Sequence, residues 1–199
     1  MPLPALLCRA VPRALLVTTL LTGTTACAAP LPEALPAGSA NEPVAALDLE
    51  RYDGTWHEVA RLPMFFQRHC VGDTTASYTR RDDGSIEVRN ACRTEGGRIE
   101  SVGAARTTDV AGALEVRFAP AWLGWVPMVW ADYWVIDLDP SYQWAVVGGP
   151  TQGAMWILSR EPTLDPALFK RIKQRAEARG YDLDNLIVDP AQRARLGDG

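Results

Sequence analysis

Residues 82–92 have the sequence Asp-Asp-Gly-Ser-Ile-Glu-Val-Arg-Asn-Ala-Cys, and this stretch indicates the fold class. Asp-Asp-Gly is a tight hairpin signal because Gly84 supplies the positive φ that such a turn requires. After the turn, every second residue belongs to one face, which carries Ile86, Val88 and Asn90. Alternation with a period of two is typical of a β-strand that buries one face.

Short strand-forming segments recur on both sides of this hairpin, and turn residues separate them. Eight strands in succession, with no helix between them, predict an antiparallel meander that forms a sandwich or closes into a barrel. The expected strands are Thr55–Leu62, Thr74–Arg80, Ser85–Cys92, Arg98–Thr107, Ala113–Phe118, Trp130–Leu138, Tyr142–Val147 and Ala154–Arg160.

One helix is expected after the eighth strand. Asp165 can cap its start, Pro166 suits its first position, and Gly180 suits the residue just past its end. Its apolar stripe predicts that it packs on the outside of the meander. Residues 186–188 could add a ninth strand, and residues 191–199 are expected to form a polar, frayed tail. The stripe consists of Leu168, Phe169, Ile172 and Ala176.

The N-terminus has the features of a signal peptide. Arg9 and Arg13 form a basic region, and the apolar run at residues 14–21 is too short to span a bilayer. We expect residues 1–26 to be removed from the mature protein.

Cys27 follows the small residues 24–26, as in a bacterial lipobox, so we expect it to be lipidated. Ala26-Cys27-Ala28 can also be an ordinary cleavage site, and this alternative stays open. By analogy with bacterial lipoproteins, Ala28 after the cysteine favours the outer membrane. Residues 27–46, rich in Ala and Pro, are expected to tether the anchor to a domain spanning residues 47–190.

Composition excludes some classes of function. The chain has 20 Lys and Arg against 24 Asp and Glu, a net charge of −4, so no basic footprint of a nucleic-acid binder is present. The 7 Trp residues all fall between Trp56 and Trp156. This aromatic content indicates a large core or an apolar cavity.

Three motifs resemble those of one family. Gly54-Thr55-Trp56-His57-Glu58-Val59-Ala60-Arg61 opens the first strand, residues 137–142 (Asp-Leu-Asp-Pro-Ser-Tyr) follow the sixth, and residues 156–162 (Trp-Ile-Leu-Ser-Arg-Glu-Pro) end the eighth. In this order they resemble the lipocalins, in particular bacterial outer-membrane lipoprotein lipocalins and their apolipoprotein D-like relatives. The resemblance implies an all-β, eight-stranded antiparallel up-and-down barrel with one C-terminal helix packed on the outside.

The resemblance also implies how the barrel closes. In the family, the Trp of the first motif plugs the closed end and an Arg of the last strand crosses it. In this sequence the resemblance assigns closure of the barrel to Gly54, Trp56 and Arg160, and it implies a cation–π pair between Trp56 and Arg160. Binding of an anionic head group by Arg160 is the less favoured alternative.

The resemblance further implies storage or transport of a small apolar ligand, such as a fatty acid or lysophospholipid, inside the barrel. The interior of an eight-stranded barrel holds side chains or one small ligand. Alternation alone leaves the inward face of strands six and eight undecided. The lining candidates are Tyr78, Val88, Asn90, Val116, Phe118, Trp134 and Met155.

Two loops expected at the barrel mouth are apolar. One contains residues 64–66 (Met-Phe-Phe), and the other, residues 121–130, contributes Trp122, Trp125 and Trp130 as ligand-binding candidates. Loops are normally polar because they lie on the surface. These loops either fold inward over the core or form an apolar lip for an acyl chain or a membrane.

Cys70 and Cys92 are expected to form a disulfide in an exported protein, and two free buried thiols are the alternative. Hairpin pairing sets Cys92 opposite about Thr75, so the disulfide requires the first mouth loop to fold back. Two His residues, His57 and His69, lack metal-ligand spacing. No metal or cofactor is therefore expected; haem on either His would be detected as a Soret band.

We expect no enzymatic activity, because the sequence lacks a G-x-S-x-G nucleophile motif and a clear triad. One alternative is a lipocalin-fold isomerase or epoxidase that uses Tyr78 or Glu58 as acid or base. Another is an envelope interaction module that uses the Trp-rich loop. The expected partners are the apolar ligand and, through the anchor, a membrane; a homodimer is a further option.

Overall fold

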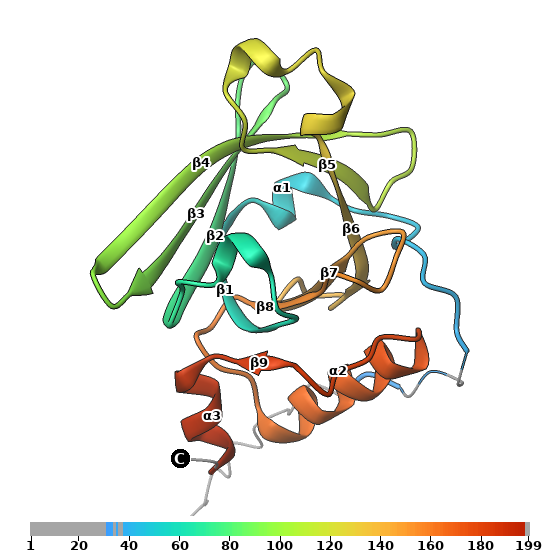
Figure 1. The fold of residues 1–199 in the computed structure, drawn as a ribbon. Helices are drawn as coiled ribbons and strands as arrows, with labels where there is room; N and C mark the ends of the chain where they lie inside the picture. Colours follow the sequence, from blue (N-terminus) through green and yellow to red (C-terminus); the bar gives the residue numbers. More distant parts are fainter. Residues whose placement is uncertain (1–30, 34, 36–37, 198–199) are drawn as a thin grey trace, which may run out of the picture. The chain divides into compact units, whose positions relative to one another are not determined.

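A closed antiparallel barrel forms the body of the protein (Figure 1). The computed structural model describes residues 31–33, 35 and 38–197. Within these residues each of β1 to β7 pairs with the next strand in sequence, and β1 also pairs with β8, which closes the sheet, and with β9. The strands are β1 (Gly54–Arg61), β2 (Gly72–Arg80), β3 (Ile86–Thr94), β4 (Gly97–Thr107), β5 (Ala113–Arg117), β6 (Ala131–Leu138), β7 (Trp144–Gly148), β8 (Trp156–Ser159) and β9 (Ile187–Val188).

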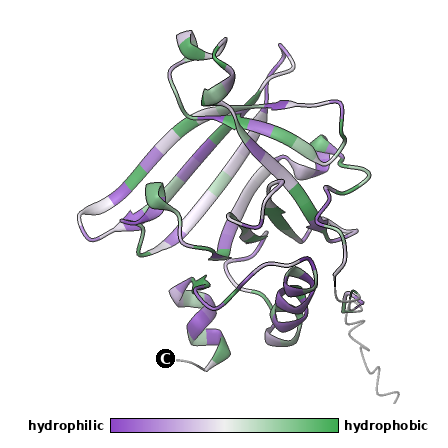
Figure 2. Cartoon of the chain, turned by 45° about the vertical axis from the view of Figure 1, so that its right-hand side comes forward, coloured by the Kyte–Doolittle hydropathy of each residue, from purple (hydrophilic) through white to green (hydrophobic). Residues whose placement is uncertain are grey.

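The predicted hairpin at residues 82–84 joins β2 and β3. Gly84 has φ 82°, the left-handed conformation that the turn needs. The register pairs Tyr78 with Val88, so their side chains share the inner face of the barrel. The strands in Figure 2 alternate between hydrophilic and hydrophobic residues, which is the pattern that predicted them.

Two hydrophobic clusters lie on opposite faces of the sheet. Along β7, Trp144 and Val146 belong to the outer cluster, while Ala145 and Val147 belong to the inner one. Strand β7 is covered on both faces, so all of its residues are buried. A strand buried on both faces has an apolar sequence throughout instead of an alternating one. The inner cluster consists of Tyr52, Trp56, Tyr78, Ile86, Val88, Ala105, Leu114, Val135, Ala145, Val147 and Leu158.

Helix α2 (Pro166–Ala178) covers the outer cluster, as the sequence predicts. The Asp165 carboxylate accepts hydrogen bonds from the backbone N–H groups of Ala167 and Leu168, which caps the helix. Phe169, Ile172 and Ala176 are its buried face.

The chain beyond β9 is helical, so the prediction of a frayed polar tail at residues 191–199 is wrong for its described part. Helix α3 (Pro190–Leu196) packs through Gln192, which is fully buried. The Gln192 amide accepts from the Leu164 N–H and donates to the Leu164 carbonyl. Both polar atoms of the amide are hydrogen-bonded, so burial of this polar side chain avoids the free-energy cost of an unsatisfied buried group.

Part of the expected tether belongs to the barrel. Val44 N–H donates to the Val135 carbonyl, and the Val44 carbonyl accepts from Gly112 N–H. Asn41 donates from its side chain to the Gly149 carbonyl. Composition rich in Ala and Pro gave no sign of these bonds. The predicted anchor, Cys27, lies outside the described residues.

A short helix, α1 (Leu49–Tyr52), follows this segment and precedes β1. Asp48 caps it through hydrogen bonds from Glu50 and Arg51 N–H. None of the described helices has the length and apolar content needed to cross a membrane.

Candidate functional site

The end of the barrel beside α1 is closed by an aromatic plug and an arginine. The Trp56 ring is fully buried and its Nε1–H donates to the Tyr52 carbonyl. The guanidinium of Arg160 lies 3.8 Å from the centroid of the Trp56 ring. Gly54 has φ 95°, and a Cβ there would come within 3.4 Å of Arg160, so glycine fits both the backbone and the space. Gly54, Trp56 and Arg160 thus seal this end.

Above the plug lies a chain of three tyrosines, of which Tyr52 and Tyr78 are buried and Tyr133 is half-buried. The hydroxyl of Tyr133 is 2.8 Å from that of Tyr52 and 2.7 Å from that of Tyr78. Burial raises the pKa of each of these hydroxyls, so all three remain protonated at neutral pH. The cavity beside them has a volume of about 10 Å³, which holds at most one water. The closed half of the lumen is therefore filled by side chains.

A polar layer follows further along β1. The Glu58 carboxylate is 2.8 Å from the guanidinium of Arg61, and both side chains are buried. Gln67 donates to Glu58 from its amide and accepts a hydrogen bond from Trp156 Nε1–H. Burial raises the pKa of Glu58, although Arg61 and Gln67 act in the opposite direction. Within this layer the negative charge of Glu58 and the positive charge of Arg61 compensate each other.

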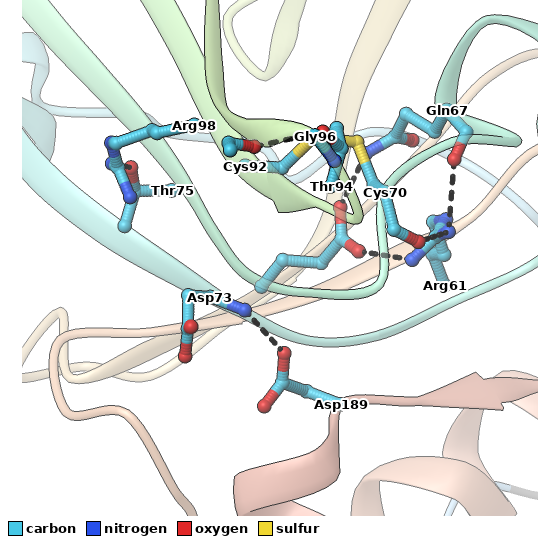
Figure 3. The surroundings of a disulfide bond; sticks show 12 residues. Arg61, Gln67, Cys70, Asp73, Thr75, Cys92, Thr94, Gly96, Arg98 and Asp189 are labelled. Atoms are coloured by element: carbon cyan, nitrogen blue, oxygen red, sulfur yellow. Dashed lines mark hydrogen bonds and ion pairs between the residues drawn. A yellow bond between two sulfur atoms is a disulfide. The ribbon is translucent and has the colours of Figure 1, made fainter.

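This polar layer fixes the first mouth loop, which contains η1 (Phe65–Gln67). The Arg61 guanidinium donates to the carbonyls of Gln67 and Cys70. Cys70 forms a disulfide with Cys92 of β3, as expected, and Figure 3 shows it beside these contacts. The register differs slightly from the prediction: Thr75 pairs with Ala91, and a bulge precedes it in β2.

The mouth loops present large apolar side chains to solvent. Loops after odd-numbered strands lie at one end of an up-and-down barrel, here the end opposite the plug. In the β1–β2 loop Phe65 is 80% exposed, and in the β5–β6 loop Trp125 is 80% and Met128 87% exposed. Phe66 and Trp122 are also exposed. These side chains form a lip rather than an inward cap.

Several predicted lining residues face the lumen. Tyr78 and Val88 belong to the inner cluster, and Val116 packs against it. Asn90 shares the face of Val88, and its Oδ1 is buried with no hydrogen-bond partner among the described residues. Phe118 lies beyond the end of β5, with its ring over the inner face of β4 at Gly103.

Two predicted lining residues, Trp134 and Met155, and one predicted mouth residue, Trp130, lie outside the lumen. Trp134 packs against the outer cluster and Met155 belongs to it, beneath α2. The stretch around Trp134 is apolar on both faces because α2 covers the outer one, so alternation could not orient it. Trp130 lies between the guanidinium groups of Arg106 and Arg117, at 4.1 and 5.1 Å from its ring centroid, and braces the β5–β6 loop.

Sequence reasoning missed some residues of the lumen. Tyr133 shares the inward face of Val135, which alternation along this strand could not assign. Arg61, Gln67 and Trp156 carried no comparable signal, because their contacts depend on how the mouth loop folds. In the described part of the chain, no group of three His, Cys, Asp or Glu side chains is arranged to hold a metal ion.

Comparison with known proteins agrees with this geometry. A family model described as a lipocalin-like domain matches residues 47–191. The chain belongs to the lipocalin family. Temperature-induced lipocalin-1 of Arabidopsis thaliana is 38% identical over 153 residues, which cover 75% of this lipocalin and 82% of the relative. Outer membrane lipoprotein Blc of Vibrio cholerae is 35% identical, with 73% and 84% covered.

A solved structure agrees with the architecture. Insecticyanin from the tobacco hornworm Manduca sexta superposes with a TM-score of 0.59, at 20% identity, over 81% of this chain and 90% of that one. At this identity the match supports the fold alone. Lipocalins generally bind small hydrophobic ligands and are typically not enzymes, and the sealed floor and apolar mouth of this barrel agree with that general role.

Proposed function

We propose that this lipocalin binds one fatty acid or lysophospholipid in the mouth half of its barrel, without chemical change to the ligand. One observation carries the proposal: the inner face of β4 toward the mouth presents two apolar side chains that no other part of the described protein covers. Ile99, on the inner face of β4, is 51% exposed, and Phe118, whose ring lies over the inner face of the same strand at Gly103, is 41% exposed. An acyl chain lying there would remove apolar surface from water, at about 25 cal/mol per Å².

The proposal includes a place in the cell. The signal peptide at residues 1–26 and lipidation of Cys27 would hold the protein at the outer membrane, on its periplasmic side. The similarity to outer membrane lipoprotein Blc of Vibrio cholerae supports this placement. Mass spectrometry of the mature N-terminus tests it: an acylated Cys27 supports the anchor, and an unmodified chain starting elsewhere contradicts it.

Native mass spectrometry after mild extraction tests the binding proposal. We expect one unaltered acyl lipid per barrel. The variant Ile99→Glu places a charge on the inner wall and should lose the lipid. Val102→Glu is a matched control, since Val102 is on the outer face of the same strand and 47% exposed. An empty wild-type barrel, or equal lipid in both variants, contradicts the proposal; a chemically altered lipid favours an enzyme.

A second function is favoured by the exposed lip. Large apolar side chains on a surface mark sites of interaction with proteins or membranes. If the lip contacts a membrane, protein lacking the anchor should pellet with vesicles, and the double variant Trp122→Ser/Trp125→Ser should not. Equal pelleting of both proteins would exclude this role for the two Trp side chains.

A further inference from the structure

Strand β4 has an uncovered edge toward the barrel mouth. It pairs with β3 from Gly97 to Ala105, whereas β5 pairs with residues 104–107 alone. In the part of the chain that the structure describes, no strand pairs with the other edge of residues 97–103. Residues 97–102 are all exposed, and in Figure 1 the β3–β4 hairpin extends to the left, beyond the end of β5. An unpaired strand edge presents N–H and C=O groups to which another chain can pair.

The backbone groups of Arg98, Glu100 and Val102 point toward this uncovered edge. Along an antiparallel ladder, pairs that exchange hydrogen bonds alternate with pairs that do not. Arg81 N–H donates to the Ser85 carbonyl at the β2–β3 turn, so the odd-numbered residues of β3 face β2 and its even-numbered residues face β4. These even-numbered residues pair with odd-numbered residues of β4. The even-numbered residues of β4 therefore have their N–H and C=O groups free for a further strand.

The side chains beside this edge complement a second copy of the same strand. Arg98 and Glu100 carry opposite charges and lie two residues apart on the outer face of β4. In an antiparallel pair, side chains directly opposite each other share a face and interact. A twofold axis at Ile99 therefore sets Arg98 of each copy opposite Glu100 of the other. The two Ile99 side chains then meet on the inner face.

The neighbouring registers do not fit. A twofold axis at Arg98 or at Glu100 sets two like charges directly opposite each other, which is destabilising. An axis at Ser101 requires the place beside Ala104 that β5 already occupies. The register at Ile99 uses only the uncovered length of the strand, and it creates two contacts between opposite charges. Charge and available length thus select the same register.

Both charges are accessible for these contacts. Arg98 is exposed and donates to a neutral group, the hydroxyl of Thr75. Glu100 is 47% exposed, and its contact with Arg89 of β3 uses Oε1. Its second carboxylate oxygen has no partner among the described residues, and a carboxylate can accept from two guanidinium groups. The contact with the second copy therefore does not require the Arg89 contact to break.

We propose that two copies of this lipocalin pair through the uncovered edges of β4, in antiparallel register about Ile99. Arg98 and Glu100 exchange backbone hydrogen bonds across the pair, and their opposite charges set the register. The sheet of one barrel thereby continues into the sheet of the other. Pairing requires no ligand, so this inference is independent of the proposed binding function.

Charge reversal tests the pairing on mature protein extracted in mild detergent. Sedimentation velocity over a range of concentrations gives the dissociation constant of the dimer for wild type, Arg98→Glu, Glu100→Arg and Arg106→Glu. Arg106 is the matched control, since it lies on the same face of β4 beside Glu115, where β5 covers the edge. Thermal melting verifies that each variant is folded.

We expect a wild-type dimer. Arg98→Glu and Glu100→Arg should each weaken it at least about tenfold, because both attractive contacts become repulsive. Arg106→Glu should dimerise as wild type does. An equal mixture of Arg98→Glu and Glu100→Arg proteins should form a heterodimer in native mass spectrometry, since opposite charges again face each other at both contacts. A merely structural effect of either substitution would not be reversed by mixing.

Three results would overturn the inference. Wild type that stays monomeric at every concentration would exclude the dimer. Dimers of Arg98→Glu and Glu100→Arg as stable as those of wild type would exclude the β4 edge as the interface. Weakened single variants that form no heterodimer on mixing would exclude the register about Ile99. Each of these results leaves the proposed binding function intact.

Discussion

The Arg160 guanidinium stacks on the Trp56 ring while it donates hydrogen bonds to four backbone carbonyls, those of residues 51, 53, 55 and 142. The first three carbonyls belong to α1, to the residue after it and to the start of β1. One side chain of the eighth strand therefore holds the N-terminal helix across the closed end of the barrel. Its contacts are structural, since all three guanidinium nitrogens donate to backbone carbonyls.

Replacing Arg160 should loosen the floor. We expect Arg160→Met to lower the free energy of unfolding by about 3 kcal/mol, because the cation–π contact and several charge-assisted hydrogen bonds are lost together. Urea unfolding followed by Trp fluorescence measures the change. Arg89→Met, at an exposed position, should cost under about 1 kcal/mol. Equal effects of the two substitutions would contradict the assigned role.

The disulfide should contribute measurably to stability. Cys70 and Cys92 are 22 residues apart in sequence, and the entropy of the loop they close predicts a loss of about 3 kcal/mol in Cys70→Ala/Cys92→Ala. Denaturant unfolding of the double variant measures this loss. In oxidised wild type, thiol titration after denaturation should detect neither cysteine. Two reactive thiols from these positions would contradict the disulfide.

Removing one member of the buried Glu58–Arg61 pair should destabilise the protein more than removing both. Glu58→Ala leaves a buried guanidinium without its carboxylate, and we expect a loss of about 3–5 kcal/mol. In Glu58→Leu/Arg61→Met no buried charge remains, so most of this loss should be recovered. Urea unfolding of the three proteins distinguishes the cases. A double variant as unstable as the single one would show that the pair acts in another way.

Glu58 also predicts a dependence on pH. Its pKa is raised in the folded state, so the folded protein holds this proton more tightly than the unfolded chain does. Its contribution to stability is complete below the unfolded value of about 4.3 and declines as the pH rises through the folded pKa. Glu58→Leu/Arg61→Met should lack this decline. Identical pH profiles of wild type and the double variant would exclude Glu58 as its source.

The tyrosine chain should resist alkaline titration. The pKa values of Tyr52, Tyr78 and Tyr133 are raised by burial, so folding opposes their ionisation. Their contribution to stability is present below the unfolded pKa of about 10 and is lost as the pH rises further. At pH 11, tyrosinate absorbance at 295 nm should lack these three groups until denaturant is added. Their immediate ionisation in folded protein would contradict the burial.

Much of the fold could be predicted because alternation and turn chemistry are local. The hairpin at Gly84 and the cap at Asp165 are examples. Where both faces of a strand are apolar, as around Trp134, the sequence could not show which face points into the lumen. The helix at Gln192 was also missed, because a side chain that looks solvent-exposed in sequence is satisfied by the distant Leu164.

The candidate site was less predictable than the fold for a related reason. Bulges in β1 and β2 are not visible in the residue pattern, yet they separate the two strands toward the mouth, where Asp189 hydrogen-bonds to both. The polar layer of Glu58 and Arg61 depends likewise on the backbone of a folded loop. Side chains that bind to distant backbone groups leave no periodic signal.

Strand β1 pairs with β8 and β9, which lie in the C-terminal part of the sequence. During synthesis it therefore emerges long before those neighbours exist, and the barrel cannot close until β8, which ends at Ser159, has left the ribosome. Contacts so distant in sequence also slow folding. The growing chain consequently stays open during most of its synthesis, and an open chain is the form that can be threaded through a narrow translocation pore.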